Sequence, residues 1–304
     1  MRGGQFGRGA VTRHHWHVPG GGHPIDRTTQ AWVRATGRRL VLAEHPWLDG
    51  PVGDPLIIGD EWVSREARRF GGTVREGGGL LASMTVLNGN SFDASQLAPE
   101  VASFYERTTD WRLEVWSQWC PAAWPFAWAL SGVFTRRLQQ LGLPLRPLDV
   151  ARGMESRVLA VINREGTQLG AAWLRTLRAT GQTVYSGWYG SAQLPLTSGP
   201  SIRVMFPLPN GSITVFLRPT VDGGALRLSS PISEFGDDGA YLIVVNGDAE
   251  TAQVRRVPLA EQFRVFVDEE GLLRTDHALD LWNIPVIRFH YRLDQSPEAS
   301  SATD

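Results

Sequence analysis

The sequence predicts an α+β protein, in which a helical, tryptophan-rich N-terminal half packs on an antiparallel β-barrel or strongly curved sheet of about ten strands. Three observations support this fold class. Short runs of β-type residues separated by glycine turns fill the chain after residue 156. Only two or three segments have helical spacing, and all of them precede residue 145. The 12 tryptophans need a large core or pocket walls to bury them.

Residues 1–40 form a segment with its own composition, rich in glycine and with Asp26 as its one acid. Its basic residues are Arg2, Arg8, Arg13, Arg27, Arg34, Arg38 and Arg39. Such a segment buries too little apolar surface to order itself, so we predict a flexible basic arm. Its arginines could contact phosphate groups. Alternatively, it is a dispensable tail, or it results from a start codon chosen too far upstream.

Residues 41–150 are predicted to be a mixed, mainly helical segment that packs on the sheet. A helix is expected to begin near Pro99, because proline suits the first helical turn and Glu100 favours the helix dipole. Residues 111–119 fit a strand through Trp111, Leu113 and Val115, although a helical reading stays open. The clearest helix is 122–141, which Gly142 and Pro144 end.

Residues 151–295 are predicted to form an antiparallel β-meander or barrel, followed by a disordered tail at 296–304. The expected strands are 157–162, 170–178, 184–192, 201–206, 212–218, 225–229, 239–245, 252–257, 263–267 and 284–293. The strongest turn is Asn210-Gly211, which we predict to be the centre of a type I′ turn with positive φ at both positions.

Composition excludes several kinds of chemistry. The chain has no lysine, so no Schiff base, lysine general base or P-loop lysine is possible. Cys120 is the single cysteine and is expected to be a buried, inert thiol in a reducing compartment. A net charge of −1 predicts no specific nucleic-acid partner. Without an apolar run of signal-peptide or membrane-span length, we expect a cytoplasmic protein, possibly peripheral to the membrane.

No motif for a catalytic triad, zinc site or nucleotide loop occurs, so no cofactor is expected. The cluster His14, His15, His17 and His23 lies in the least ordered segment, and we therefore expect no metal site. The best catalytic candidates are His277 or a carboxylate such as Asp276 as general base and Arg178 as an anion anchor. On a strand, Asp276 and His277 point to opposite faces, and Arg274 and Asp276 would share a face as an ion pair.

Arginine and aromatic residues are dense in the hairpin around residue 180 and could line a pocket for a planar or acidic ligand. The candidate ligand-binding residues are Trp173, Arg175, Tyr185, Trp188, Tyr189 and, on the last strand, His290. They could equally be an ordinary sheet surface, and the sequence does not decide which face is the interior.

Five segments in the part of the chain from 99 to 293 stand out as a set: 104–108 (FYERT), 137–144 (RLQQLGLP), 173–178 (WLRTLR), 206–211 (FPLPNG) and 273–277 (LRTDH). Through them, residues 99–293 resemble the YndJ-like family, in its soluble C-terminal domain and its stand-alone actinobacterial relatives. The resemblance implies no reaction. YndJ-like proteins carry a membrane region before this domain, where this chain has the basic arm.

Three functions remain open. The first is binding of a hydrophobic or amphiphilic small molecule, such as a lipid or polyketide-like metabolite, in the barrel. The second is a cofactor-independent isomerase, cyclase or hydrolase of secondary metabolism on the same scaffold. The third is attachment to an anionic membrane surface through the basic arm and the aromatic residues of 124–134.

Overall fold

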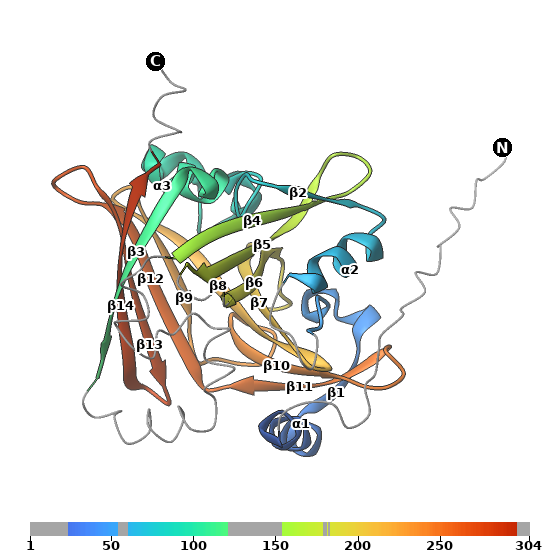
Figure 1. Ribbon diagram of the computed structural model, residues 1–304. Coiled ribbons are helices and arrows are strands. Elements are labelled where there is room, and N and C mark those ends of the chain that lie inside the picture. The colour runs from blue at the N-terminus through green and yellow to red at the C-terminus, as the bar shows by residue number, and fades with distance from the viewer. Residues whose placement is uncertain (1–23, 54–59, 121–153, 179–180, 182, 297–304) are drawn as a thin grey trace, which may run out of the picture.

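A strongly curved antiparallel sheet dominates the computed structural model, which describes residues 24–53, 60–120, 154–178, 181 and 183–296 (Figure 1). Its strands are β1 (Arg38–Val41), β2 (Thr73–Glu76), β3 (Trp111–Trp119), β4 (Met154–Ile162), β5 (Gln168–Leu177), β6 (Thr183–Ala192), β7 (Ser201–Leu208), β8 (Gly211–Asp222), β9 (Ala225–Ser230), β10 (Gly239–Val245), β11 (Thr251–Val257), β12 (Leu259–Val267), β13 (Leu273–Leu281) and β14 (Ile284–Gln295). The α-helices are α1 (Pro24–Thr36), α2 (Glu61–Arg69) and α3 (Pro99–Glu106), and 3₁₀ turns lie at Leu42–Glu44, Pro46–Leu48, Met84–Leu87, Ala94–Gln96 and Thr108–Asp110.

The main path of the sheet runs β2-β4-β5-β6-β7-β8-β9-β12-β13-β14-β3. Neither end of this path pairs with the other within the described residues, so the sheet is curved but not closed into a barrel. The antiparallel, strand-rich architecture that the sequence predicts is therefore confirmed.

The long strand β8 splits the sheet into two branches. Its first half pairs with β10, in the register Gly239 to Phe216, and its second half pairs with β9, in the register Arg218 to Ser229. At the branch point, Arg218 donates hydrogen bonds to Asp237 and to the buried Asp238. The β10 branch continues through β11 to β1, and it carries α1 at the lower end of the molecule (Figure 1).

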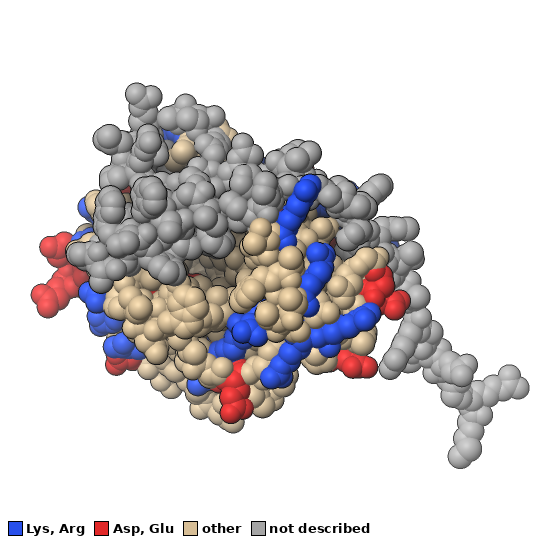
Figure 2. Space-filling model, turned by 90° about the horizontal axis from the view of Figure 1, so that it is seen from below, with Lys and Arg blue, Asp and Glu red and all other residues tan. Residues whose placement is uncertain are grey.

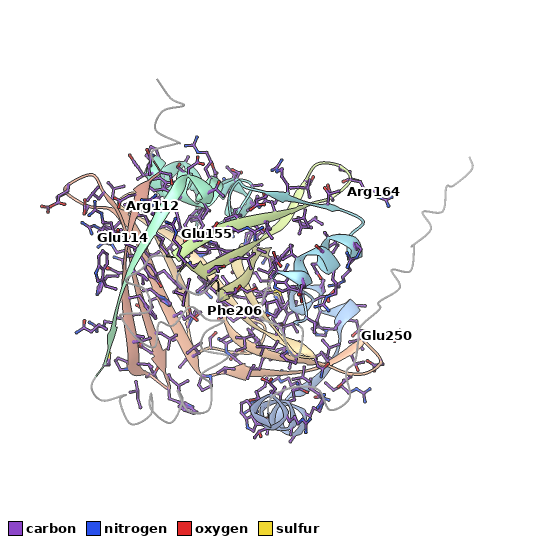
Figure 3. The ribbon with its side chains drawn as sticks, in the orientation of Figure 1. Arg112, Glu114, Glu155, Arg164, Phe206 and Glu250 are labelled. Carbon is purple, nitrogen blue, oxygen red and sulfur yellow. The ribbon has the colours of Figure 1, made fainter. Side chains whose placement is uncertain are left out.

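The upper end of the concave face is filled by side chains. Helix α3 buries Val101, Phe104 and Tyr105, and Phe104 makes edge-on ring contacts with Trp111 and Trp173. Phe206, labelled in Figure 3, reaches the same cluster through Tyr185, at 5.5 Å between ring centroids. Burial of these aromatic residues closes the concave face at the α3 end.

The elements agree with the sequence at most positions that can be compared. Each of the ten expected strands is present, the helix begins at Pro99, and residues 111–119 form a strand. The strand Leu273–Leu281 was not among those expected. The predicted helix 122–141 and the aromatic residues of 124–134 lie outside the described residues.

The turn prediction at Asn210-Gly211 is wrong in one respect. Leu208 pairs with Gly211, so the two loop residues are Pro209 and Asn210, and only Asn210 has a positive φ, of 58°. Proline followed by a residue with positive φ is the pattern of a type II turn rather than type I′. Gly211 serves another purpose, because a Cβ there would clash with the Ile243 carbonyl oxygen.

The segment boundaries also differ from those expected. Residues 24–40 belong to the folded part, because α1 buries Asp26, Gln30 and Val33 along one face and β1 pairs with β11. Gln30 Nε2 donates a hydrogen bond to the Pro209 carbonyl at 3.0 Å. The described part of 41–150 consists of short helical turns, α2, α3 and two strands rather than mainly helix. Residues 1–23 and 297–304 lie outside the described part.

Candidate functional site

Six polar side chains converge on the otherwise apolar concave face of the sheet. Arg175, Tyr185 and Tyr189 come from β5 and β6, whereas Glu261, His277 and Tyr291 come from β12, β13 and β14. Side chains alternate between the faces of a strand, so each of these residues shares its face with core residues such as Trp173, Val265 and Leu293. The curvature brings the two walls together, because the Arg175 guanidinium lies 6.0 Å from the Tyr291 ring. We call these six residues the concave polar cluster.

Arg175 is the most unusual member of the cluster. The residue is only 8% exposed, and its Nε has no hydrogen-bond partner among the described residues. Its guanidinium stacks over the rings of Trp173 at 4.0 Å and Tyr185 at 5.0 Å. No described carboxylate forms an ion pair with it, so this buried cation lies among aromatic rings and beside the Tyr291 hydroxyl.

The tyrosines of the cluster are strongly desolvated. The hydroxyls of Tyr185 and Tyr189 lie 2.5 Å apart. Burial raises the pKa of Tyr185 well above its ordinary value, and the neighbouring Tyr189 adds to this rise. Burial likewise raises the pKa of Tyr189 to about 12 and that of Tyr291 to about 12, against the opposing effect of Arg175. All three hydroxyls therefore stay protonated and can donate hydrogen bonds.

Glu261 and His277 form the other side of the cluster. Glu261 Oε2 lies 3.2 Å from His277 Nε2, but the contact lacks the alignment of a hydrogen bond. The imidazole is stacked between two phenyl rings, at 3.8 Å from Phe263 and 5.2 Å from Phe289. This pair offers a carboxylate and an imidazole next to an apolar wall.

The concave face is fully buried near α3 and less completely buried toward the other end of its strands. Near α3, the inward-facing Val265, Leu273 and Leu293 are at most 2% exposed. Toward the opposite end of the same strands, inward-facing residues keep partial exposure, with 13% for the Glu261 side chain and 11% for that of His277. Leu279 and Leu281 beyond them are also half-buried. The cluster thus lies between a fully buried, aromatic end and a less buried, apolar end.

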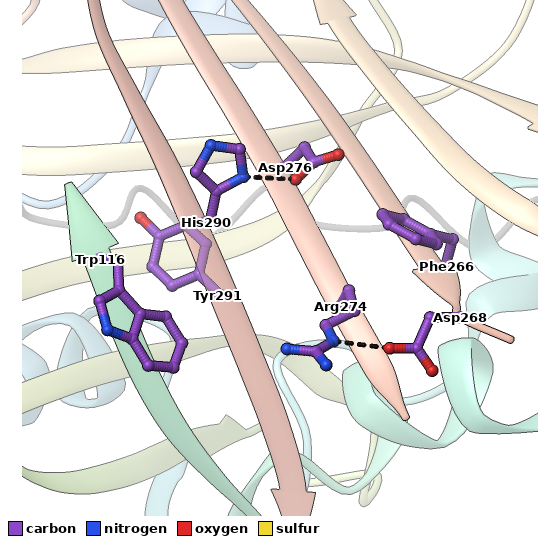
Figure 4. Close-up of a pocket in the computed structure, with 7 residues that line it drawn as sticks. All are labelled: Trp116, Phe266, Asp268, Arg274, Asp276, His290 and Tyr291. Atoms are coloured by element: carbon purple, nitrogen blue, oxygen red, sulfur yellow. Dashed lines mark hydrogen bonds and ion pairs between the residues drawn. The ribbon is translucent and has the colours of Figure 1, made fainter. Parts of the chain in front are cut away.

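A depression lies on the convex face of the same strands (Figure 4). It measures about 290 Å³ and is lined by Trp116, Phe266, Asp268, Arg274, Asp276, His290 and Tyr291. His290 Nδ1 lies 2.7 Å from Asp276 Oδ1, and Arg274 donates to Asp268 at 2.8 Å, as the dashed lines show. Both members of the His290–Asp276 pair are about half exposed.

The structure divides the residues predicted from sequence between different places. Trp173, Arg175, Tyr185, Tyr189 and His277 lie on the concave face, whereas Asp276 and His290 meet on the convex face. Arg274 pairs with Asp268 and Glu270, so the expected Arg274–Asp276 ion pair is not formed.

Two further residues lie apart from both sites. Trp188 packs under α2, where its indole meets Trp62 at 6.1 Å between centroids, on the opposite face from Tyr189. Arg178 is exposed in the turn after β5. The buried arginine of this strand is Arg175 instead.

Sequence reasoning missed Glu261 and Tyr291 as members of the site. Tyr291 could have been found, because it alternates with Phe289 and Leu293 on the apolar face of the last strand. Glu261 carried a weaker signal, a lone acid two residues before Phe263 and in phase with Val265. Their meeting with Arg175 depends on curvature, which no local pattern encodes.

Two searches of the described residues gave negative results. They contain no group of three or more histidine, cysteine or acidic residues placed to hold a metal ion. None of the helices in that part of the chain combines the length and the apolar character needed to cross a membrane. The four N-terminal histidines lie outside this part.

Comparison with known proteins finds one relative whose name is informative. No family model matches the chain, and no solved structure matches it. Over 223 residues, the chain is 29% identical to a Bacillus subtilis (strain 168) protein named "Uncharacterized membrane protein YndJ". The match covers 71% of this chain but 38% of that relative, so the chain corresponds to little more than a third of its length. The similarity supports the resemblance to YndJ-like proteins that the sequence segments indicate.

Proposed function

We propose that the chain binds an amphiphilic small molecule with an acidic head group, held on the concave face by Arg175. The observation that carries the proposal is the buried guanidinium with no carboxylate partner among the described residues. Holding an unpaired cation away from water is costly, and an anionic group placed against it would offset that cost. Tyr291 and one hydroxyl of the Tyr185–Tyr189 pair would donate further hydrogen bonds to the same group, because the other hydroxyl of the pair donates within it.

The apolar part of such a ligand would lie toward the less buried end of the concave face. Phe263, Phe289 and His277 form a stacked wall there, and Leu279 and Leu281 extend it. An apolar surface with a few fixed polar groups is the usual composition of a lipid or cofactor pocket. The similarity to a relative named as a membrane protein favours a lipid-like ligand over a soluble metabolite.

A second candidate is an enzyme that acts on the bound molecule without a cofactor. The observation in its favour is the Glu261–His277 contact beside the Arg175 cluster. His277 would take a proton from the ligand, and Glu261 would stabilise the resulting imidazolium.

Native mass spectrometry of protein purified from its own organism tests both functions. Binding predicts an acidic, lipid-sized adduct on the wild-type protein that is lost in Arg175→Gln. Catalysis predicts, in addition, that His277→Gln carries a different compound, because unreacted substrate accumulates, and chromatography of the extracted ligand separates it from the wild-type one even when the two are isomers. A wild-type protein of bare mass would refute both proposals, and the same extracted compound from wild type and His277→Gln would refute the enzyme.

A further inference from the structure

Helix α1 and the two strands beside it expose a tryptophan and several arginines at the lower end of the molecule. Because Asp26, Gln30 and Val33 are buried, the opposite helix face is turned outward. Trp32, with 43% of its surface exposed, and Arg34 are both exposed, on the two flanks of that outward side. Arg38 of β1 and Arg255 of β11 are exposed beside it. We call Trp32, Arg34, Arg38 and Arg255 the α1 surface.

The arginines of this surface are held in place without being neutralised. The Arg255 guanidinium lies 5.5 Å from the Trp32 ring and donates to the Thr36 carbonyl at 2.9 Å. Arg38 lies 4.7 Å above the Phe235 ring. Among the described residues, no carboxylate forms an ion pair with Arg34, Arg38 or Arg255, whereas Arg39 is paired with Asp248 at 3.7 Å. The surface therefore carries three arginines without a carboxylate partner among the described residues, and one of them, Arg255, lies against an exposed indole.

The α1 surface lies at the same end of the molecule as the less buried end of the concave face. Helix α3 closes the upper end, and α1 lies at the lower end, toward which the concave wall becomes less buried (Figure 1). Figure 2, which views the molecule from below, shows arginine side chains spread over the part of this face where α1 lies, with few acidic ones between them. The chain as a whole has a net charge of −1, so any attraction to a polyanion must come from such a local surface.

We propose that the α1 surface docks on an anionic lipid bilayer. Arginines that keep their charge and their fork of donors suit lipid phosphates, and tryptophan is the side chain that best occupies the headgroup boundary. Binding to the phosphate backbone of a nucleic acid requires only positive charges. The exposed indole of Trp32 has no role in such binding, so it favours a lipid surface as the partner. Docking would point the less buried end of the concave face toward the membrane. This proposal rests on surface residues alone and does not require the proposed ligand.

Co-sedimentation of the full chain with vesicles tests the docking. The wild type is expected to pellet with phosphatidylcholine vesicles that contain phosphatidylserine at low salt, and much less with phosphatidylcholine alone. The triple variant Arg34→Gln/Arg38→Gln/Arg255→Gln should lose affinity by about two orders of magnitude, at roughly fivefold for each arginine. Trp32→Ser should weaken the binding that persists at ~0.15 M salt, where charges are screened.

A matched control separates a local surface from net charge. Arg75→Gln/Arg112→Gln/Arg164→Gln removes the same charge from exposed positions, of which Arg112 and Arg164 are seen at the upper end in Figure 3. This variant should pellet like the wild type, and circular dichroism should show both triple variants folded. Equal loss in both variants, full binding by the α1-surface variant, or binding of the wild type to DNA but not to vesicles would each overturn the proposal.

Discussion

Arg256 is half-buried and Arg175 is buried, and their surroundings differ: Arg256 bonds to backbone carbonyls, whereas Arg175 packs on aromatic rings. Arg256 donates to the carbonyls of Pro231, Glu234, Asp237 and Asp238 and to the hydroxyls of Ser233 and Tyr241. Arg175 instead lies against the aromatic rings of Trp173 and Tyr185, with no carboxylate partner among the described residues. An arginine that satisfies many backbone groups contributes to stability, whereas a buried cation without a carboxylate partner points to a ligand.

This contrast predicts different effects of the same substitution. Arg256→Met should lower the free energy of unfolding by about 3 kcal/mol or more, because it leaves several carbonyls unpaired. Arg175→Met should change it by less than about 1 kcal/mol, because the lost cation–π contacts are offset by removal of a buried charge. Urea unfolding of the ligand-free variants measures both. A loss at Arg175 as large as that at Arg256 would show that Arg175 is structural.

The residues of the site could be predicted only in part. The hairpin was correctly identified as rich in arginine and aromatic residues, and Trp173, Arg175, Tyr185 and Tyr189 do share a face. Trp188 was grouped with them by composition, but it is adjacent to Tyr189 and therefore lies on the other face, as strand alternation requires.

At the scale of elements, turn chemistry made most strands predictable, but the short strands β1 and β2 and the irregular strand β13 were missed. Strand β13 lies between two clear turns, but it carries Arg274, Asp276, His277 and Asp280 on both faces, so its alternation of polarity is blurred. Helix α1 was hidden for a similar reason, because its buried face includes the polar Asp26 and Gln30. Strand β8 pairs with β9 in a local hairpin, but it also pairs with β10 through residues more than 20 positions apart in the sequence. The periodicity of a single strand does not encode such a distant pairing.

At the scale of the whole molecule, all five tyrosines lie in surroundings that disfavour their ionised form. Burial is the largest cause, and it raises the pKa of Tyr105, Tyr185 and Tyr241 and brings those of Tyr189 and Tyr291 to about 12. In the unfolded chain each tyrosine ionises near pH 10. The unfolded state therefore loses protons first as the pH rises, and stability is present below pH 10 and is lost between about pH 10 and 12.

A spectroscopic titration checks this prediction. Tyrosinate absorbance of the folded protein should stay well below half of its final value at pH 10 and should rise together with unfolding. Tyr189→Phe and Tyr291→Phe should each make the loss of stability above pH 10 less steep. Half-ionised tyrosines at pH 10 in a chain that circular dichroism shows to be folded would contradict the burial of the concave polar cluster.

The most direct test of the account is the binding of palmitate, a long-chain carboxylate, measured by titration calorimetry with the full chain. We predict that the wild type binds palmitate, that Arg175→Gln weakens the affinity by about tenfold or more, and that Arg178→Gln, a variant of the exposed arginine three residues away, binds like the wild type. Hexadecanol, which lacks the charge, should bind wild type and Arg175→Gln alike. Equal palmitate affinity in wild type and Arg175→Gln, or no binding by the wild type, would contradict the assignment of Arg175 as the anchor of an acidic amphiphile.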